Sequence, residues 1–272
     1  MGLDLLDSLK KEVPIETSKQ KINSSIDKVT AAFEKSLKFD YNHLSLVEYY
    51  YQCCESVFGL DYGLSEVSGF TTILTNYQDL PKFNLRAGLF YAALVNNFEI
   101  GELTVFTDNL EKKLDCIGFK NKNKNIVVQG NAGFGAGYFM HSGSLAVNGN
   151  AGCYAGAYLE DGIIEIKGNC NYGAGSNMYS GSLHIAGECQ YVGFEMFGGK
   201  ILVDKFVSGY VGEKMRNGFI EVNEYVIGLA GWQMYGGIIK INGEFTPRIH
   251  KCNGGKIYHK GRLCMKDGHL LI

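Results

Sequence analysis

A repeat of 18 or 19 residues begins at Ile126 and continues toward the C-terminus, and few folds are compatible with it. Each row of the repeat opens with an apolar–variable–apolar triplet, as in Ile126–Val128 and Leu145–Val147. Alternation with a period of two places the two apolar residues on the same face of a β-strand. A row of this length fits one coil of a β-solenoid and is too short for a helical hairpin. The rows begin at Ile126, Leu145, Ile164, Leu183, Ile201, Ile220 and Ile239, and an eighth begins at Ile257.

Two further positions are apolar in every row, which predicts buried columns along the stacked coils. Side chains of the first column enlarge along the chain, and the second, the methionine column, is rich in a residue that fills irregular spaces well. The first column contains Ala132, Ala151, Cys170, Cys189, Val207, Val226 and Phe245. The methionine column contains Met140, Leu159, Met178, Met196, Met215, Met234 and Cys252.

Glycine accounts for 36 residues against 3 prolines, and 27 of the glycines lie between Ile126 and Lys256. Many of them form two structural columns, because a corner repeated in every coil needs a positive φ or a close approach between coils. The first column precedes each new strand and contains Gly143, Gly162, Gly181, Gly199, Gly218, Gly237 and Gly255. The second contains Gly137, Gly156, Gly175, Gly193, Gly212 and Gly231, and row seven has no glycine at this position. Lys205 and Glu224 replace glycines at another position, so we expect wider corners in the later coils.

The segments GNAGFGAG, GNAGCYAG and GNCNYGAG, and the row endings MYSGSLHI, MFGGKILV and MYGGIIKI, resemble the GXGXG domain. That domain is the C-terminal region of the large glutamate synthase subunit. It also forms one of the subunits of formylmethanofuran dehydrogenase and of the related formyltransferase/hydrolase complex. The resemblance covers about residues 103–272 and implies a right-handed, single-stranded parallel β-helix. It also implies a non-catalytic role beside catalytic domains or subunits, and it supplies no catalytic residue.

The first 102 residues have a helical pattern instead of the repeat. Apolar residues at three- and four-residue spacing from Ile22 to Leu37 predict an amphipathic helix. Ser45 and Glu48 match a capping box before a helix over 49–58, and 85–97 predicts a third helix. Residues 103–106 predict an early strand, and 120–125 a polar loop. We therefore expect a mainly β fold, with a helical N-terminal cap and docking region over 1–102 and seven or eight coils over 103–272.

Composition and motifs argue against several classes of function. A net charge of −2 lacks the basic excess of a nucleic-acid-binding protein. No apolar run is long enough to cross a bilayer, and the N-terminus carries acids where a signal peptide is basic, so we expect a cytoplasmic protein. The chain lacks a phosphate-binding loop, a G-x-S-x-G motif and the strand–helix context of a dinucleotide site. We expect no nucleic-acid, membrane or cofactor partner.

Histidines and cysteines gather near the C-terminus, and both are metal-ligand types. The residues are His250, Cys252, His259, Cys264 and His269. Their spacing fits no zinc pattern, and Cys252 already belongs to the methionine column. The group is therefore a weak metal candidate, and an end cap that includes histidines is the simpler interpretation.

Carboxylates do not form a ladder along the outward strand position, where an acid-dependent glycan hydrolase would place them. Glu195 and Glu213 come from adjacent coils near one corner and are the best pair for acid–base chemistry, although exposed charge is the simpler interpretation. The outward strand position instead contains favourable cross-strand neighbours, namely Glu165 with His184 and Glu221 with Lys240.

Aromatic residues lie beside the glycine corners. Phe134, Tyr172 and Tyr191 share one column, which Cys153 interrupts, and Tyr154 and Tyr210 lie in the next. We expect partial burial over the turn below, with a flat partner-binding face as the alternative.

The favoured function is a non-catalytic scaffold subunit of a glutamate synthase-like or formyl-transfer complex, with protein subunits or further copies of the chain as partners. The alternative is a hydrolase of a small ester or a glycan, with a site on the flank of the β-helix or beside the N-terminal helices. A concave pocket around Glu195 and Glu213 or the C-terminal group would favour the enzyme. An exposed apolar strip would favour the scaffold.

Overall fold

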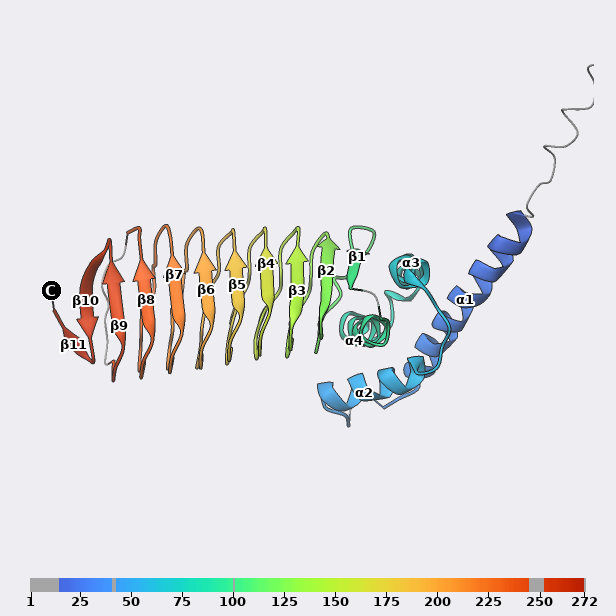
Figure 1. Ribbon diagram of the computed structural model, residues 1–272, viewed down its shortest axis with the longest axis horizontal. Helices are drawn as coiled ribbons and strands as arrows, with labels where there is room; N and C mark the ends of the chain where they lie inside the picture. Colours follow the sequence, from blue (N-terminus) through green and yellow to red (C-terminus); the bar gives the residue numbers. More distant parts are fainter. Residues whose placement is uncertain (1–14, 41–42, 100, 245–251, 272) are drawn as a thin grey trace, which may run out of the picture.

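The computed structural model describes residues 15–40, 43–99, 101–244 and 252–271, with side chains described from residue 25 onward. It is a parallel β-helix of about eight coils, with four α-helices at its N-terminal end (Figure 1). The predicted fold class is therefore confirmed. Phe245 of the first column and His250 of the C-terminal group lie outside the described residues.

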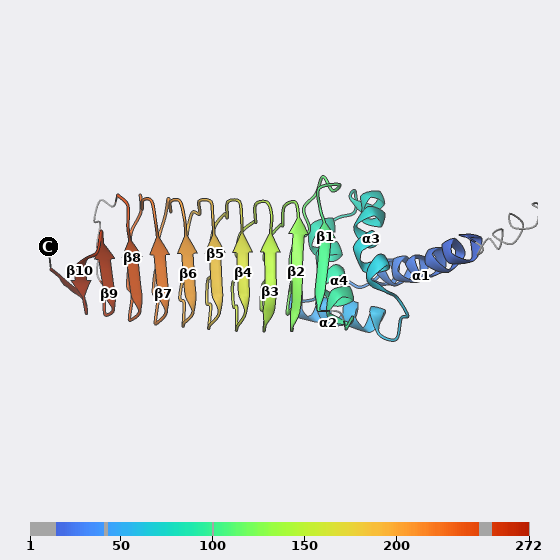
Figure 2. The ribbon, with the colours of Figure 1, turned by 45° about the horizontal axis from the view of Figure 1, so that its top comes forward.

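The strands form one sheet in chain order, so that consecutive strands are neighbours, and each coil contributes one strand to it (Figure 2). Strands β1 to β9 pair in parallel and in register, so that Ile164 lies between Leu145 and Leu183. The parallel strands are β1 (Glu102–Phe106), β2 (Lys124–Gln129), β3 (Gly143–Val147), β4 (Ile163–Ile166), β5 (Ser182–Ile185), β6 (Lys200–Val203), β7 (Phe219–Val222), β8 (Ile238–Ile241) and β9 (Lys256–His259).

Both predicted columns are buried, since none of their described members is more than 7% exposed. A third inward column, which the sequence reading missed, lies in the glycine-rich part of the coils and is equally buried. It consists of Ala136, Ala155, Ala174, Val192, Val211 and Ala230. The interior of the rod is thus a continuous apolar core.

All the glycines of the two predicted columns have a positive φ, between 64° and 100°. A Cβ atom at Gly181 would lie 2.6 Å from the carbonyl oxygen of Gly162 on the preceding coil. Conformation and close approach between coils therefore both require glycine there, as predicted.

The N-terminal cap contains the predicted helices and one that the sequence reading missed, α3. The capping box is present, because the backbone N–H of Ser45 donates to Glu48 Oε2 at 2.7 Å and that of Glu48 to Ser45 Oγ at 3.3 Å. The helices are α1 (Ile15–Ser36), α2 (Leu46–Val57), α3 (Leu64–Leu74) and α4 (Phe83–Asn96), with a short 3₁₀ helix η1 (Thr75–Tyr77) after α3.

Helices α3 and α4 lie against the β1 end of the sheet (Figures 1 and 2). The backbone N–H of Asp115 donates to Asn84 O at 3.0 Å, and Asn96 Nδ2 donates to Phe119 O at 2.9 Å. Gly88 permits this contact, because a Cβ there would lie 1.7 Å from Asp115 O. The helices and the coils share one apolar core, so the open edge of the first coil is covered.

The C-terminal end departs from the repeat. After β9 the chain reverses, and β10 (Arg262–Lys266) and β11 (His269–Leu270) are antiparallel. Lys260 and Gly261 both have a positive φ, as do Asp267 and Gly268, which is the geometry of a two-residue hairpin turn. The sheet therefore ends in a short strand, which offers little edge for pairing with another chain.

Candidate functional site

The predicted carboxylate pair lies together at one corner of adjacent coils. The backbone N–H of Glu195 donates to Glu213 O at 2.8 Å, while Oε1 of Glu195 lies 3.8 Å from Nζ of Lys214. The pKa of Glu213 is raised above its ordinary value of 4.5, chiefly by partial burial. The ammonium of Lys214 opposes this shift, and the carboxylate of Glu195 adds to it. Because the ammonium of Lys214 pairs with one of the two acids, the corner is a salt bridge with a second acid beside it.

The C-terminal group does not assemble into a ligand set within the described residues. Cys252 and Cys264 are buried, and Cys252 Sγ lies 2.9 Å from Gly254 O. His259 Nε2 lies 2.9 Å from Gly243 O, and His269 is exposed. The two cysteines and His259 thus contact the backbone around them, whereas a metal site would need several of these side chains directed at one point.

Both predicted pairs of outward cross-strand neighbours lie side by side in the sheet, but only one of them forms an ion pair. Lys240 Nζ lies 2.8 Å from Glu221 Oε1, as expected. Glu165 is the register neighbour of His184, but Nε2 of His184 lies 2.8 Å from Oδ2 of Asp204 instead. Glu165 and His184 are therefore cross-strand neighbours, as predicted, but no ion pair joins them, because the imidazole turns toward the following coil.

The corner aromatics form one continuous ladder, although the sequence placed them in two columns. Neighbouring ring centroids lie 4.5 to 5.6 Å apart; Tyr172 is 40% exposed, and the other rings of the ladder are partly buried. The predicted partial burial over neighbouring turns is confirmed. The ladder contains Phe134, Tyr154, Tyr172, Tyr191, Tyr210 and Trp232.

A second corner has a repeating backbone geometry that the sequence reading missed. In six consecutive coils the residue before the methionine column has a left-handed φ of 50° to 55°, although none of these residues is glycine. The turn sends the next residue into the core and the one after it to the surface. The left-handed residues are Phe139, Tyr158, Asn177, Glu195, Lys214 and Gln233.

The residues that follow the methionine column form an outward line along the rod, which we term the corner stripe. From Glu160 onward, the backbone N–H of each member donates to the carbonyl of a methionine-column residue one coil earlier, at 2.8 to 2.9 Å. This shared hydrogen bond fixes the spacing of the stripe. Its members are His141, Glu160, Tyr179, Phe197, Arg216 and Tyr235.

Aromatic and cationic contacts continue along the corner stripe. The rings of Tyr179 and Phe197 stack with centroids 5.0 Å apart, and both side chains are exposed. The guanidinium carbon of Arg216 lies 5.1 Å from the Phe197 ring and 6.0 Å from that of Tyr235, which is 59% exposed. The stripe therefore offers a row of rigid aromatic surfaces with a delocalised cation between them.

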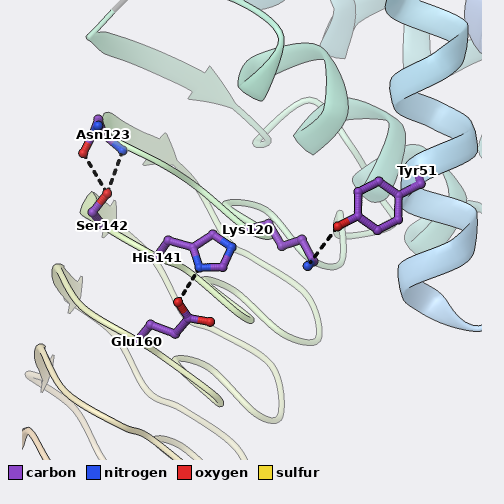
Figure 3. Close-up of polar contacts among 6 residues, drawn as sticks. All are labelled: Tyr51, Lys120, Asn123, His141, Ser142 and Glu160. Carbon is purple, nitrogen blue, oxygen red and sulfur yellow. Dashed lines mark hydrogen bonds and ion pairs between the residues drawn. The ribbon is translucent and has the colours of Figure 1, made fainter.

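Polar contacts replace the aromatic ones where the corner stripe approaches the helical cap (Figure 3). Nδ1 of His141 lies 2.6 Å from Oε2 of Glu160, and the ring nitrogen is the donor, since an ionised carboxylate only accepts. The other ring nitrogen points away from Glu160 (Figure 3). Ser142 Oγ donates to Asn123 Oδ1 at 2.7 Å. These contacts join neighbouring coils beside the cap.

Lys120 connects helix α2 to this region. Its Nζ lies 3.5 Å from the hydroxyl oxygen of Tyr51 (Figure 3). The same nitrogen lies 5.4 Å from the centre of the Tyr51 ring and 5.8 Å from that of the Phe139 ring. The cap and the first coils are therefore held by a cation between two aromatic rings as well as by the shared core.

A scan against protein-family models finds no match for this chain, and a search of curated proteins finds none either. In the part of the chain that the structure describes, no helix has both the length and the apolar character needed to cross a bilayer.

The sequence also contains a signal for the corner stripe. Reading the residue after each member of the methionine column gives His141, Glu160, Tyr179 and Phe197 in turn. In-register coils place such residues beside one another, so the imidazole–carboxylate pair and the ring stack follow from the alignment.

Proposed function

We propose that this chain is a non-catalytic scaffold subunit that holds protein partners of a multi-subunit enzyme complex, of the glutamate synthase-like or formyl-transfer kind. The corner stripe carries this proposal. Tyr179, Phe197 and Tyr235 are between 36% and 59% exposed on one line of the rod, with Arg216 among them. Tyrosine, phenylalanine and arginine are enriched in protein interfaces, where they dominate the binding energy.

The side chains of the corner stripe are already held in place before a partner binds, which suits an interface. Backbone hydrogen bonds fix each member, and stacking restricts the rings before any partner arrives. Binding then orders few side chains, which lowers its entropic cost. The neighbouring outward column adds Ile163, which is 53% exposed at the start of β4.

The shape of the rod supports a scaffold. The apolar core runs from the helical cap through the coils, so the two ends keep a fixed separation. A partner on the stripe and another on the cap would be held at a constant distance. The identity proposed for these partners rests on the resemblance of the glycine-rich rows to the GXGXG domain.

The test is co-purification of the tagged chain from its native host, compared between two matched variants. Phe197 and Tyr225 are 36% and 37% exposed, and each stacks on an aromatic neighbour, but only Phe197 belongs to the corner stripe. We expect a glutaminase, synthase, ferredoxin-like or formyl-transfer subunit to accompany the wild type and Tyr225→Ser in stoichiometric amount, and to be lost with Phe197→Ser. Recovery of the chain without such a subunit, or equal recovery with both variants, would contradict the proposal.

The hydrolase alternative has one observation in its favour, the His141–Glu160 pair. A carboxylate that accepts from one imidazole nitrogen orients the ring and leaves the other nitrogen to take a proton from a nucleophile. Lys120 and the exposed Tyr51 lie in the same region (Figure 3). A small ester is the substrate class that such a general base would serve.

An ester screen tests the alternative. Hydrolysis of p-nitrophenyl acetate that His141→Gln abolishes, and that His184→Gln leaves intact, would favour the enzyme. His184 is the matched control because it also pairs with a carboxylate across coils and has a side-chain exposure of 37%, against 36% for His141. Equal rates in both variants and in the wild type would remove the alternative.

A further inference from the structure

The fourth coil is one residue shorter than its neighbours at the aromatic corner. Three residues separate Cys189 from Gly193, whereas four separate Val207 from Gly212. The backbone absorbs the difference locally, because the N–H groups of Gly173 and Ala174 both donate to Tyr191 O, each at 3.1 Å.

Two adjoining hollows lie beside this irregularity, and Ser208 lines both of them. The larger, of about 280 Å³, lies toward the third coil and includes Asn171, Glu188 and Gln190. The smaller, of about 210 Å³, lies toward the sixth coil and includes Tyr191 and Tyr210. Each is below the usual size of a small-molecule site, roughly 300 to 1,000 Å³, so a ligand of several linked rings would fit the two better than a single compact one.

Polar side chains in the hollows are available to a ligand. Asn171, Gln190 and Ser208 are exposed, and their side chains make no hydrogen bond to another described residue. Glu188 is oriented, because Asn169 Nδ2 donates to its Oε1 at 3.2 Å. These groups supply donors and acceptors in close succession, while Tyr191, Tyr210, Ile227 and Leu229 line the smaller hollow and supply apolar surface.

The chemistry of the lining selects among ligands. Among the residues that the structure describes, no lysine, arginine or histidine lines either hollow, so the lining offers no cation to a phosphate or another anion. The larger hollow is lined by amides, a hydroxyl and one carboxylate, whereas the smaller is lined mainly by Tyr191, Tyr210, Ile227 and Leu229, so together they suit a ligand with both polar and apolar faces. Sugar rings fit both properties, because their hydroxyl groups pair with amides and their C–H faces lie against the negative face of an aromatic ring.

We propose that these two hollows form a binding site for a neutral oligosaccharide that lies across coils three to six. We expect binding without cleavage, since Glu188 is the only carboxylate among the described residues that line the site, whereas most glycoside hydrolases use a pair of carboxylates. The inference stands apart from the scaffold function and uses a different corner of the rod.

The test titrates the full chain with cellohexaose, xylohexaose, maltohexaose and chitohexaose. Binding is followed by saturation-transfer NMR and by the fluorescence of Trp232, which is the only tryptophan and stacks on Tyr210 with centroids 5.4 Å apart. We expect at least one of these sugars to bind in the millimolar range or tighter, because the hollows are open to solvent.

Variants locate the site. Gln190→Ala and Tyr191→Ala should each weaken binding about tenfold, and Tyr179→Ala, on the corner stripe, should leave it unchanged. Gln190 is exposed, so its variant keeps the test decisive even if removal of the Tyr191 ring perturbs the ladder. The proposal is overturned if none of the four sugars shows saturation transfer, or if Gln190→Ala binds as tightly as the wild type.

Discussion

The guanidinium carbon of Arg216 lies 5.1 Å from the ring centre of Phe197, on the preceding coil. It also lies 6.0 Å from the ring of Tyr235, on the following coil. The two contacts place one cation between two exposed aromatic rings, so the corner stripe is a connected surface rather than a series of isolated side chains. A stripe of this kind has a measurable contribution to stability even before a partner binds.

Arg216→Gln should lower the free energy of unfolding by about 1 kcal/mol, since each exposed cation–aromatic contact contributes roughly 0.5 to 1 kcal/mol. Arg216→Lys should retain part of that contribution, because an ammonium also interacts with a ring face. Urea unfolding followed by circular dichroism measures both variants. Equal stability of Arg216→Gln and the wild type would show that the rings and the guanidinium merely lie near each other.

Gly181→Val should destabilise the rod strongly. Gly181 has a φ of 76°, and an added Cβ would lie 2.6 Å from Gly162 O, so the variant meets both backbone strain and a clash between coils. Gly59→Val is the matched control, because Gly59 has a φ of 73° and nothing lies within 4 Å of its added Cβ. We expect the midpoint of thermal unfolding to fall further for Gly181→Val, with a difference in unfolding free energy of more than about 1 kcal/mol. Equal effects would mean that only φ matters at these corners.

Glu221→Gln should lower the free energy of unfolding at neutral pH and change it little in acid. Hydrogen bonds from Lys240 and Asn242 lower the pKa of Glu221 below its ordinary value of 4.5. Its contribution is therefore present above that value and is lost as the pH falls through the lower pKa of the folded state. We expect a loss of at most about 1 kcal/mol at neutral pH, since Lys240 is partly exposed.

Glu165→Gln serves as the control for this measurement, because Glu165 is exposed and makes no ion pair with another described residue. Urea unfolding at neutral pH and near pH 3 separates the two variants. A Glu221→Gln deficit that persists unchanged in acid would contradict the assignment.

Thiol reactivity should divide the eight cysteines into two classes. Cys54 and Cys153 are partly exposed, and the other six are buried. Burial raises the pKa of Cys53 and Cys116, and raises that of Cys189 to about 12, so these groups supply almost no thiolate at neutral pH. Ellman's reagent should modify no more than two thiols in the folded chain and all eight in guanidinium. Rapid reaction of a third thiol would show that the core opens locally.

The inward faces of the rod could be predicted from the sequence because one rule applies in every coil. A residue such as Ile164 or Met178 is apolar in a column of apolar residues, and the parallel register makes columns of sequence into columns in space. The positive φ values of the corner glycines follow from the same alignment. Periodicity therefore determines burial wherever the repeat is intact.

Contacts that depend on the direction of a side chain could not be predicted from the repeat. The pattern gives His184 two register neighbours, Glu165 and Leu202, but not its preference for Asp204, which depends on the imidazole rotamer. The left-handed turn at Glu195 lies in a column of mixed residue types, so composition gave no sign of it.

The C-terminal reversal had a signal that the repeat obscured. Asp267 and Gly268 form a dipeptide that is typical of a hairpin turn, and they connect β10 to β11. Helix α3 was missed for the opposite reason, since its short sequence LSEVSGFTTIL contains β-branched residues and a glycine that disfavour helix. Packing against α1 and β1 outweighs that local preference.

Because the strands from β1 to β9 pair in register, the length of the rod changes in equal steps, one for each coil. Each row of 19 residues adds one coil, and each coil advances the chain by about 4.8 Å along the axis. Loss or duplication of one complete row, such as residues 164–182, would leave every interior column continuous while moving the C-terminal hairpin by a single unit. Gain or loss of whole rows would therefore change the distance between the helical cap and the C-terminal hairpin in discrete steps, with no change in the sequence of either end.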